Sequence, residues 1–324
     1  MAETLRVATY HSDLSRKGPA VLLRDIAGQD DAQVRAVTEV IARAGADVIL
    51  LLDFDWDLDG LAVAALQTVL AERGAPYPHH VALRPNSGQP SGFDLDRNGR
   101  WGEGRDALGY GRFTGDGAMV LLSRVPLGAV TDHSDRLWTA ENPGAESVLP
   151  EGAGSVVPLA SVAQWVVPLR VEGADITLVT MSANTPVFDG PEDRNGLRNA
   201  DELAFVARLA ETLAMPIVLG RANLDPADGD GTRGAIEALL AHPALQDPRP
   251  RGDGGGGAGH RGDPALDTMD WDGPGPLRVD YVLPSRALTV EGSGVLWPAP
   301  DDPFAAVVAT ASRGRLVWVD IALP

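Results

Sequence analysis

The sequence contains no cysteine, and Lys17 is its only lysine. Without cysteine, the chain has no disulfide bonds, no thiolate metal ligands and no cysteine nucleophile, while its cellular compartment stays open. Because nearly every positive charge is therefore an arginine, the chain is suited to binding carboxylates or phosphates through paired hydrogen bonds. The guanidinium group keeps its proton at physiological pH, so these cations do not serve as bases.

Long apolar runs are missing as well. No run approaches the ~20 residues that a membrane-spanning helix needs, and residues 1–6 are too short and too polar for a signal peptide. We therefore expect no membrane span. The expected location is periplasmic or extracellular if a signal peptide has been trimmed, and cytoplasmic otherwise.

Positive charge is scarce relative to negative charge, which gives a formal net charge of -18. Such a field repels polyanions, so non-specific binding to nucleic acid is not expected. A local basic pocket for a small anion is still compatible with this balance. The partner is unknown from composition, and both a small anionic ligand and a protein partner stay open.

Apolar residues are plentiful enough for a large core. The chain has 324 residues, 44% of them hydrophobic, and nothing in it marks a boundary, so we predict one domain over 1–324. A glycine-rich stretch over 247–276 is predicted to be a mobile loop. Apolar patterns predict strands over 5–10, 47–52, 118–122, 158–171, 176–180, 216–219 and 277–283, helices over 31–44, 61–72, 199–214 and 234–241, and a final hairpin within 305–321 around 312–314. This mixture favours a layered α/β sandwich.

A long surface excursion, residues 84–117, is rich in Gly, Asn, Asp and Arg. It contains Asp94, Asp96 and Asn98 at alternate positions and then Gly99, which is the first half of a calcium-binding loop. Arg105 stands where the closing glutamate of such a loop would be. Two interpretations stay open, a bound Ca²⁺ or a plain turn shaped by Asp and Asn side chains.

The stretch from Met215 to Gly231 combines a short apolar strand with an acidic turn. Gly220 lets the backbone bend, and oxygen-bearing side chains follow in the loop, as a divalent cation would require. Arg221 contradicts this picture because it places a permanent cation among the carboxylates. The oxygen-bearing side chains of this loop are Asn223, Asp225, Asp228 and Asp230.

Taken in order, these pieces resemble the endonuclease/exonuclease/phosphatase superfamily, the metal-dependent phosphoesterases related to DNase I. A bacterial branch of it is marked by a phrase like PVFDGPEDRNG, which here ends at Gly196. The resemblance implies a four-layer α/β sandwich, with two mixed, mainly antiparallel sheets flanked by helices and an active site at one rim. It also implies hydrolysis that depends on Mg²⁺.

The resemblance assigns site positions along the chain, and several of them carry unusual residues. The family's asparagine after the first strand falls on His11, its metal-binding glutamate on Asp53, and its phosphate-facing histidine on Ser182. In the G-D-x-N turn Arg221 replaces the aspartate, while Asn223 is kept, as is Asp280 further on. The terminal S-D-H motif reads Ser312-Arg313-Gly314, so its aspartate and its histidine are both lost.

These replacements predict a catalytically degenerate phosphoesterase fold, a pseudo-enzyme, because an acid, a base and metal-binding charge are lost together. Three interpretations stay open. In the first, Asp53, Arg221 and Arg313 form internal salt bridges. In the second, an anion pocket is made by Arg221, Arg313, Asn223 and His11. In the third, the chain is still a divalent-metal-dependent phosphodiesterase or phosphatase, with Mg²⁺ held by His11, Asp53 and either Asp225 or Asp228.

Overall fold

Two large β-sheets form the centre of the molecule. The computed structural model describes residues 4–256 and 260–323. The first sheet has six strands in the order β12-β13-β1-β2-β4-β3, with bounds Thr289–Val295, Val317–Ala322, Thr4–His11, Val48–Phe54, Ala118–Ser123 and His79–Val81. The second has five in the order β11-β8-β7-β6-β5, with bounds Asp280–Pro284, Met215–Arg221, Ile176–Ser182, Trp165–Pro168 and Thr131–Asp132.

Both sheets are mixed, with one parallel pair each. β1 runs parallel to β2, and β7 runs parallel to β8, while the other neighbouring strands are antiparallel. β2 and β4 are buried on both faces and read as continuous apolar runs, as expected for central strands. The two parallel pairs, β1 with β2 in the first sheet and β7 with β8 in the second, therefore end at the same rim of the molecule.

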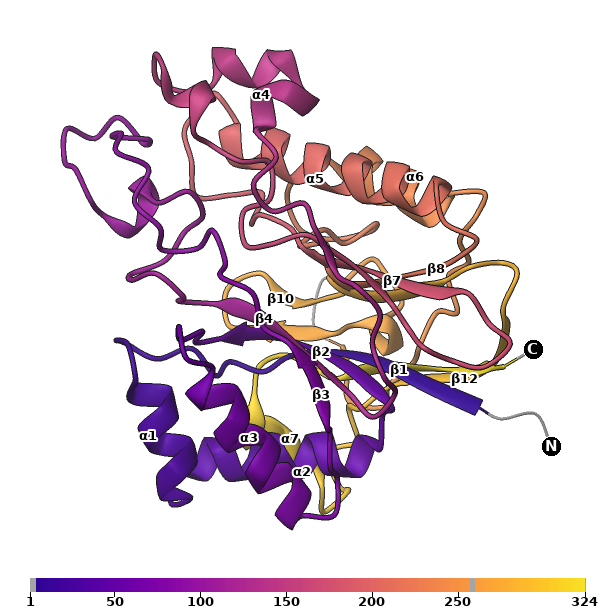
Figure 1. The fold of residues 1–324 in the computed structure, drawn as a ribbon. Coiled ribbons are helices and arrows are strands. Elements are labelled where there is room, and N and C mark those ends of the chain that lie inside the picture. Colours follow the sequence, from indigo (N-terminus) through magenta and orange to yellow (C-terminus); the bar gives the residue numbers. More distant parts are fainter. Residues whose placement is uncertain (1–3, 257–259, 324) are drawn as a thin grey trace.

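Helices cover the outer faces of the sheets and complete four layers (Figure 1). Against the first sheet lie α1 (Val21–Gly28), α2 (Ala32–Ala44), α3 (Leu61–Glu72) and α7 (Ala305–Ala311). Against the second lie α5 (Arg194–Glu211) and α6 (Arg233–Leu240), while the short α4 (Trp138–Glu141) packs near α5. Between the sheets, apolar side chains of both inner faces form one shared cluster.

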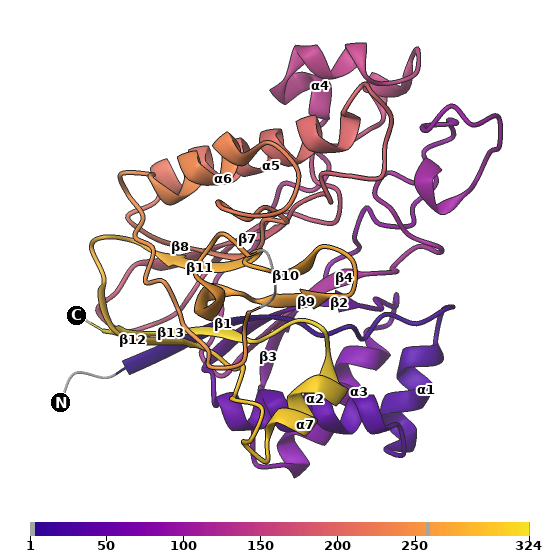
Figure 2. The ribbon, with the colours of Figure 1, turned by 180° about the vertical axis from the view of Figure 1, so that it is seen from behind.

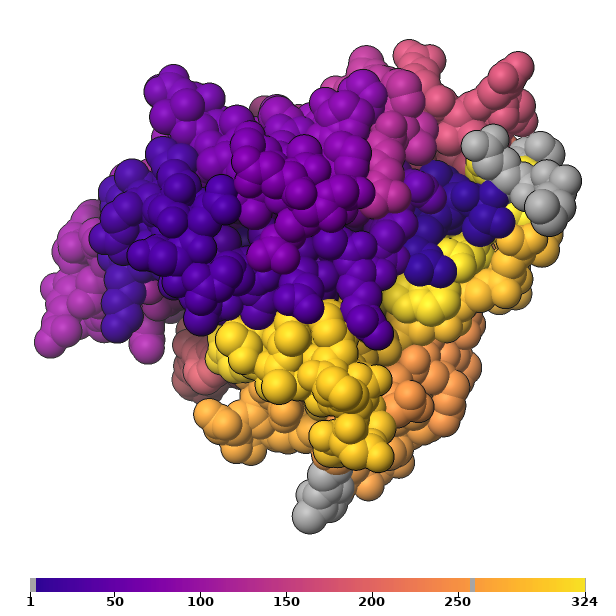
Figure 3. Space-filling model, turned by 90° about the horizontal axis from the view of Figure 1, so that it is seen from below, coloured from indigo at the N-terminus to yellow at the C-terminus, as the bar shows by residue number. Residues whose placement is uncertain are grey.

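The helical face of the first sheet is built from the two ends of the chain. Figure 3 shows indigo and violet N-terminal residues beside the yellow C-terminal segment on this face.

Both ends of α2 are fixed by its own sequence. At the start, the Asp31 side chain accepts a hydrogen bond from the Val34 N–H, and at the end Gly45, in the left-handed conformation, stops the helix.

The predicted fold class is confirmed, but two local predictions are wrong. The stretch predicted as a final hairpin within 305–321 contains α7 followed by β13. The glycine-rich stretch 247–276 is not a plain loop, because it contains a 3₁₀ turn (Pro264–Leu266), strand β9 (Met269–Trp271) and the start of β10 (Gly275–Leu277). Residues 257–259 lie outside the described part, and the mobility of this stretch stays a prediction. Figure 2 shows β9 and β10 between the two large sheets.

Other elements differ from the predictions in extent. The strand predicted over 158–171 is confined to β6, Trp165–Pro168, and α5 begins at Arg194, five residues before the predicted start. Neither α1 nor the strands β3, β5 and β12 were predicted. Further 3₁₀ turns span Gly104–Asp106, Pro143–Ser147 and Ala153–Ser155. Among the residues that the structure describes, no helix is both long enough and apolar enough to cross a bilayer.

Candidate functional site

The rim formed by the two parallel strand pairs carries the candidate site. His11 at the end of β1 lies beside Leu52 of β2, and Ser182 at the end of β7 lies beside Arg221 of β8. Their side chains border a cavity of about 900 Å³, a volume suited to a small molecule. Its lining includes most of the predicted site residues: His11, Asp53, Ser182, Arg221, Asn223 and Arg313.

Arg221 forms a buried ion pair with Asp280 at this rim. The two residues are direct partners on the antiparallel strands β8 and β11. Nε and Nη2 of Arg221 donate to the two carboxylate oxygens of Asp280 at 2.9 and 2.8 Å, and both side chains are almost fully buried. The guanidinium carbon of Arg221 also lies 5.8 Å from the ring centre of Trp271 in β9. Asp280 is therefore neutralised and held in place by an arginine.

Arg313 is neutralised by Asp13, which lies two residues after His11. Nη2 of Arg313 donates to Asp13 Oδ1 at 2.8 Å, and the Arg313 backbone N–H donates to Oδ2 at 2.9 Å. Nε of Arg313 and the Ser312 hydroxyl also donate to Asp13 Oδ2, at 3.2 and 3.0 Å. Burial acts to raise the pKa of Asp13, but the neighbouring His11 and the hydrogen bonds from Arg313 hold it below its usual value. This carboxylate therefore stays ionised.

His11, Asp13 and Asp53 form a compact group of metal-ligand side chains. One ligand atom from each residue lies within 4.8 Å of the others. Nδ1 of His11 is buried without a hydrogen-bond partner, and Oδ1 of Asp13 lies 3.5 Å from it. Burial, together with the charge of Arg221, lowers the pKa of His11 to about 3, so the imidazole is neutral at physiological pH. A neutral imidazole beside two carboxylates fits a divalent cation.

Asp53 is the least compensated carboxylate of this group. Burial raises its pKa to about 7, and the nearby charge of Asp13 adds to the rise. Within the described residues, the Asp53 carboxylate neither accepts a hydrogen bond nor pairs with an arginine. A cation bound between these side chains would relieve the repulsion between the two carboxylates.

The backbone is strained where these side chains enter the rim. Asp13, Asp53 and Asn223 all adopt the left-handed conformation, with φ of 50°, 59° and 54°. For residues other than glycine this costs on the order of 1 kcal/mol or more each. Asp53 also lies where the pairing of β2 with β4 shifts register, between Leu51 and Phe54. Such irregularities turn side chains toward a site rather than into the core.

Gly314, the residue on which the family resemblance places the terminal histidine, packs against the end of β1. A Cβ atom added to Gly314 would lie 2.4 Å from the carbonyl oxygen of His11 and 2.8 Å from its Cβ. Gly314 also forms a β-bridge with Met269 of β9. The backbone as it stands therefore has no space for a histidine side chain here.

The predicted salt bridges have the wrong partners. Arg221 pairs with Asp280 and Arg313 pairs with Asp13, whereas Asp53 pairs with neither arginine. The predicted anion pocket is affected as well, because both of its arginines are already paired with carboxylates. His11 is neutral, and Nδ2 of Asn223 donates to the Ala183 carbonyl oxygen at 2.7 Å. These residues line the cavity but do not offer an anion two uncompensated cations.

Two of the acidic residues after Asn223 stabilise the turn instead of the site. Asp225 accepts hydrogen bonds from three backbone N–H groups, and Asp228 accepts them from the backbone at 261–262. The predicted metal sets that used Asp225 or Asp228 are therefore wrong. Asp230 differs from both because it lines the cavity.

Asp13 is the site residue that sequence reasoning missed. One signal could have revealed it, since a residue so close in sequence to a predicted site residue stays near the same end of the strand. Asp13 stands two residues after His11 and so reaches the same volume. Its pairing with Arg313, 300 positions away, could not be read from local patterns.

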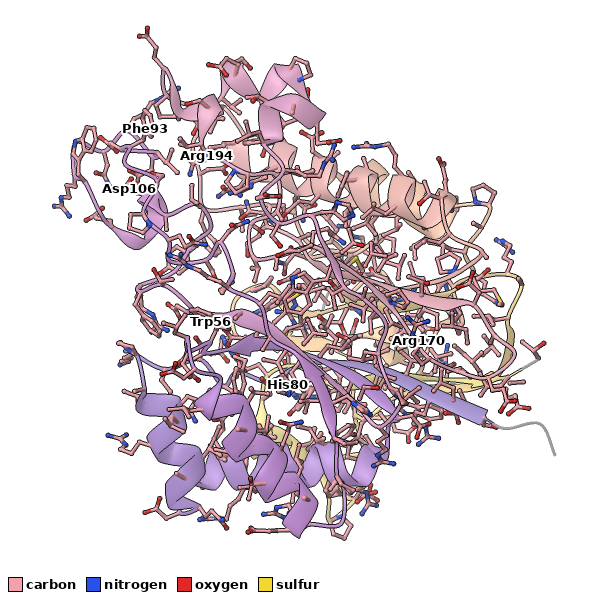
Figure 4. All side chains as sticks on the ribbon, in the orientation of Figure 1. Trp56, His80, Phe93, Asp106, Arg170 and Arg194 are labelled. Atoms are coloured by element: carbon pink, nitrogen blue, oxygen red, sulfur yellow. The ribbon has the colours of Figure 1, made fainter. Side chains whose placement is uncertain are left out.

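The excursion contains a second acidic group, formed by Asp94, Asp96 and Asp106, whose oxygens lie within 4.8 Å of one another. Figure 4 shows Asp106 in the part of the molecule that extends beyond the sheets. Asn98, the third predicted ligand, instead donates through Nδ2 to Asp96 and Glu103. Asp94 accepts hydrogen bonds from two backbone N–H groups of the turn, at 3.1 and 2.8 Å. This group, too, could bind a metal ion.

The four-layer sandwich and its polar rim define a DNase I-like α/β protein. The sequence profile described as the Endonuclease/Exonuclease/phosphatase family matches residues 24–313, so the chain belongs to that family. No curated protein sequence matches the chain.

Solved structures share this fold at low sequence identity. An endonuclease/exonuclease/phosphatase from Beutenbergia cavernae superimposes with a TM-score of 0.60 at 19% identity, covering 99% of this chain and 72% of that one. A family protein from Leptotrichia buccalis gives 0.56 at 15% identity, with 98% and 100% covered. Sphingomyelinase C from Streptomyces griseocarneus gives 0.55 at 14% identity, with 98% and 99% covered. These likenesses establish the fold.

Proposed function

We propose that the chain is a catalytically degenerate member of its family that binds a divalent cation and, through it, a small phosphorylated molecule at the rim. The observation that carries the proposal is the group of His11, Asp13 and Asp53, with its unpartnered imidazole nitrogen and its uncompensated carboxylate. One nitrogen and two oxygen donors favour Mn²⁺ or Zn²⁺ over Mg²⁺, which prefers oxygen ligands alone.

The charges at the rim explain why anion binding would depend on the cation. Arg221 and Arg313 each compensate one carboxylate, and His11 is neutral, so these residues offer no uncompensated cation, while Asp53 and Asp230 add carboxylates that no arginine of the described residues pairs with. An anion is repelled by that balance. A divalent cation in the same place would reverse the sign and make the rim attractive to phosphate.

Loss of hydrolysis follows from the residues at the family's acid and base positions. Ser182 is a weak neutral donor, Arg221 is a permanent cation bound to Asp280, and Gly314 carries no side chain. General acid and general base catalysis each contribute about 10²-fold to 10⁴-fold, so their joint loss leaves little activity.

A hydrolase with a rearranged site is the second candidate, and Asp230 favours it. Asp230 lines the cavity, and none of the described residues forms an ion pair with it. A divalent cation at His11, Asp13 and Asp53 would supply Lewis-acid stabilisation of charge on a phosphoryl oxygen. Asp230 would then orient or deprotonate the attacking water.

Titration with MnCl₂ and phosphate tests the proposal. Isothermal titration calorimetry of the metal-free protein is expected to show Mn²⁺ binding, and phosphate binding only when Mn²⁺ is present. His11→Gln and Asp53→Asn are expected to lose both, whereas the matched control Asp94→Asn keeps both. Metal-independent phosphate binding would overturn the proposed role of the cation.

Hydrolysis of bis-p-nitrophenyl phosphate separates the two candidates. The degenerate protein is expected to give no release of p-nitrophenol above buffer with Mg²⁺, Mn²⁺ or Zn²⁺. The wild type would instead be a hydrolase if it releases p-nitrophenol, and if this release disappears in both Asp53→Asn and Asp230→Asn but persists in Asp94→Asn.

The acidic group of the excursion suits Ca²⁺ because its three donors are carboxylate oxygens. Asp106 is buried, and its carboxylate accepts hydrogen bonds from the N–H groups of Leu95 and Glu103, which orient it within the group. We assign this site a structural role, because it lies on the excursion and shares no residue with the rim cavity.

A further inference from the structure

Two exposed aromatic rings stand at the mouth of the cavity. Three aromatic side chains of the described residues are largely exposed: Trp101, Tyr110 and Phe188, at 70%, 67% and 81%. Tyr110 and Phe188 both line the rim cavity, and both also line an adjacent cavity of about 690 Å³. Trp101 lines neither. A single exposed ring is common on protein surfaces, but two exposed rings that share the wall of a polar cavity are typical of a ligand-binding surface.

The backbone holds Phe188 in an unfavourable conformation. Its φ is 72°, in the left-handed region that a bulky residue rarely adopts. Both neighbours are fixed by Asn195, whose Nδ2 donates to the Val187 carbonyl oxygen at 2.8 Å and whose backbone N–H donates to the Asp189 carboxylate. The turn therefore keeps the ring outside the core at a cost in stability, which is typical of residues that bind ligands.

Tyr110 is presented by an equally fixed backbone. Gly109 and Gly111 flank it. A Cβ atom added to Gly109 would lie 1.6 Å from the Ser161 carbonyl oxygen, and one added to Gly111 would lie 2.5 Å from the Gly88 nitrogen. The Gly109 carbonyl accepts a hydrogen bond from Gly88 at 2.9 Å. Close backbone packing on both sides of one exposed ring fixes where that ring stands.

We propose that Phe188 and Tyr110 form a ring-binding subsite, and that the phosphorylated ligand carries a planar aromatic group. This inference rests on the proposed function, because it names the organic part of the same ligand. The cation group binds the phosphate, while the two rings stack on the planar group at the mouth, where Trp271 also lines the wall. A net charge of -18 disfavours a long polyanion as the source of that group, which leaves a small aryl or nucleoside phosphate.

Phenyl phosphate and inorganic phosphate are the probes for this subsite. In the presence of Mn²⁺, the wild-type protein is expected to bind phenyl phosphate about tenfold more tightly than phosphate, the contribution expected of ring stacking. Phe188→Ala and Tyr110→Ala are each expected to lower that ratio toward one. Phe188→Tyr is expected to retain it, and so is the matched control Trp101→Ala.

A stability measurement separates a binding role from a structural one. Phe188→Gly removes the ring and the left-handed strain together, so its melting temperature is expected to be equal to or above that of the wild type while the affinity ratio falls. A fall of many degrees would show that the ring supports the fold and would overturn the inference.

The remaining outcomes are also decisive. Equal affinity of the wild type for the two probes would overturn the ring-binding subsite and leave the proposed function intact. Binding of neither probe would overturn both. Binding to phosphatidylcholine vesicles that disappears in Phe188→Ala would assign the rings to a lipid surface and would likewise overturn the inference.

Discussion

Arg221 and Asp280 face each other across the antiparallel pair β8 and β11, joined by two hydrogen bonds in a region closed to solvent. Removing either partner leaves a buried charge without its counter-charge. Asp280→Asn and Arg221→Met are each expected to lower the free energy of unfolding by about 3 to 5 kcal/mol. Urea denaturation measures the loss.

The double variant Arg221→Met/Asp280→Leu is the control for that pair. It is expected to recover most of the stability, because an apolar pair of similar volume replaces both charges. Additive losses in the double variant would show that the two side chains do not act on one another.

Gly314 is expected to tolerate no side chain. Gly314→Ala places a Cβ atom 2.4 Å from the His11 carbonyl oxygen and is expected to lower the free energy of unfolding by about 1 to 3 kcal/mol. The matched control is Gly234→Ala in α6, where an added Cβ meets nothing within 4 Å. That control is expected to gain about 0.5 to 1 kcal/mol, since alanine has the higher helix propensity. Equal effects at both positions would contradict the close packing of Gly314.

The stability of the metal-free protein is expected to depend on pH through Asp53. Its pKa rises from 3.8 to about 7 on folding. Between these values the folded chain binds the proton more tightly than the unfolded chain, so stability falls as pH rises through this window. Asp53→Asn removes the dependence and is expected to exceed the wild type by up to about 4 kcal/mol at pH 8, but not at pH 4. Thermal melts with chelator present check this, and equal slopes would contradict it.

Calcium is expected to stabilise the excursion independently of the rim. Excess CaCl₂ is expected to raise the melting temperature by about 2 to 4 °C in the wild type and in Asp53→Asn alike. Asp94→Asn is expected to lose this rise. No change between chelator and CaCl₂ in the wild type would mean that the acidic residues only shape the turn.

Much of the sandwich could be predicted from the sequence because its strands and helices have clear periodicity. β2 is a run of apolar residues, and α2 has an apolar stripe between a capping aspartate and a glycine. α7 was missed because its β-branched residues favour a strand by propensity alone. Packing decided otherwise: Val308 and Ala311 are buried against the first helical layer, and the Asp302 carboxylate accepts a hydrogen bond from the Phe304 N–H just before the helix.

The sequence groups residues that the structure also places around one cavity, but it does not give their pairings. The family resemblance named Arg221, Arg313 and Asp53, and all three line the cavity. Which carboxylate meets which arginine depends on strand register and on a left-handed turn at Asp13, and neither leaves a local sequence signal. The exposed rings of Tyr110 and Phe188 were missed for the same reason, because exposure is a property of the folded surface.

The contact between Gly314 and His11 also joins the C-terminal segment to the end of β1. A side chain at 314 would require the two backbone segments to separate, and that separation would disturb the bridge to Met269 and the hydrogen bond that Ser312 donates to the His11 carbonyl oxygen. The position of the His11 imidazole therefore depends on residues 312–314, so a substitution there is expected to weaken cation binding at the rim without replacing any of the residues that would hold the cation.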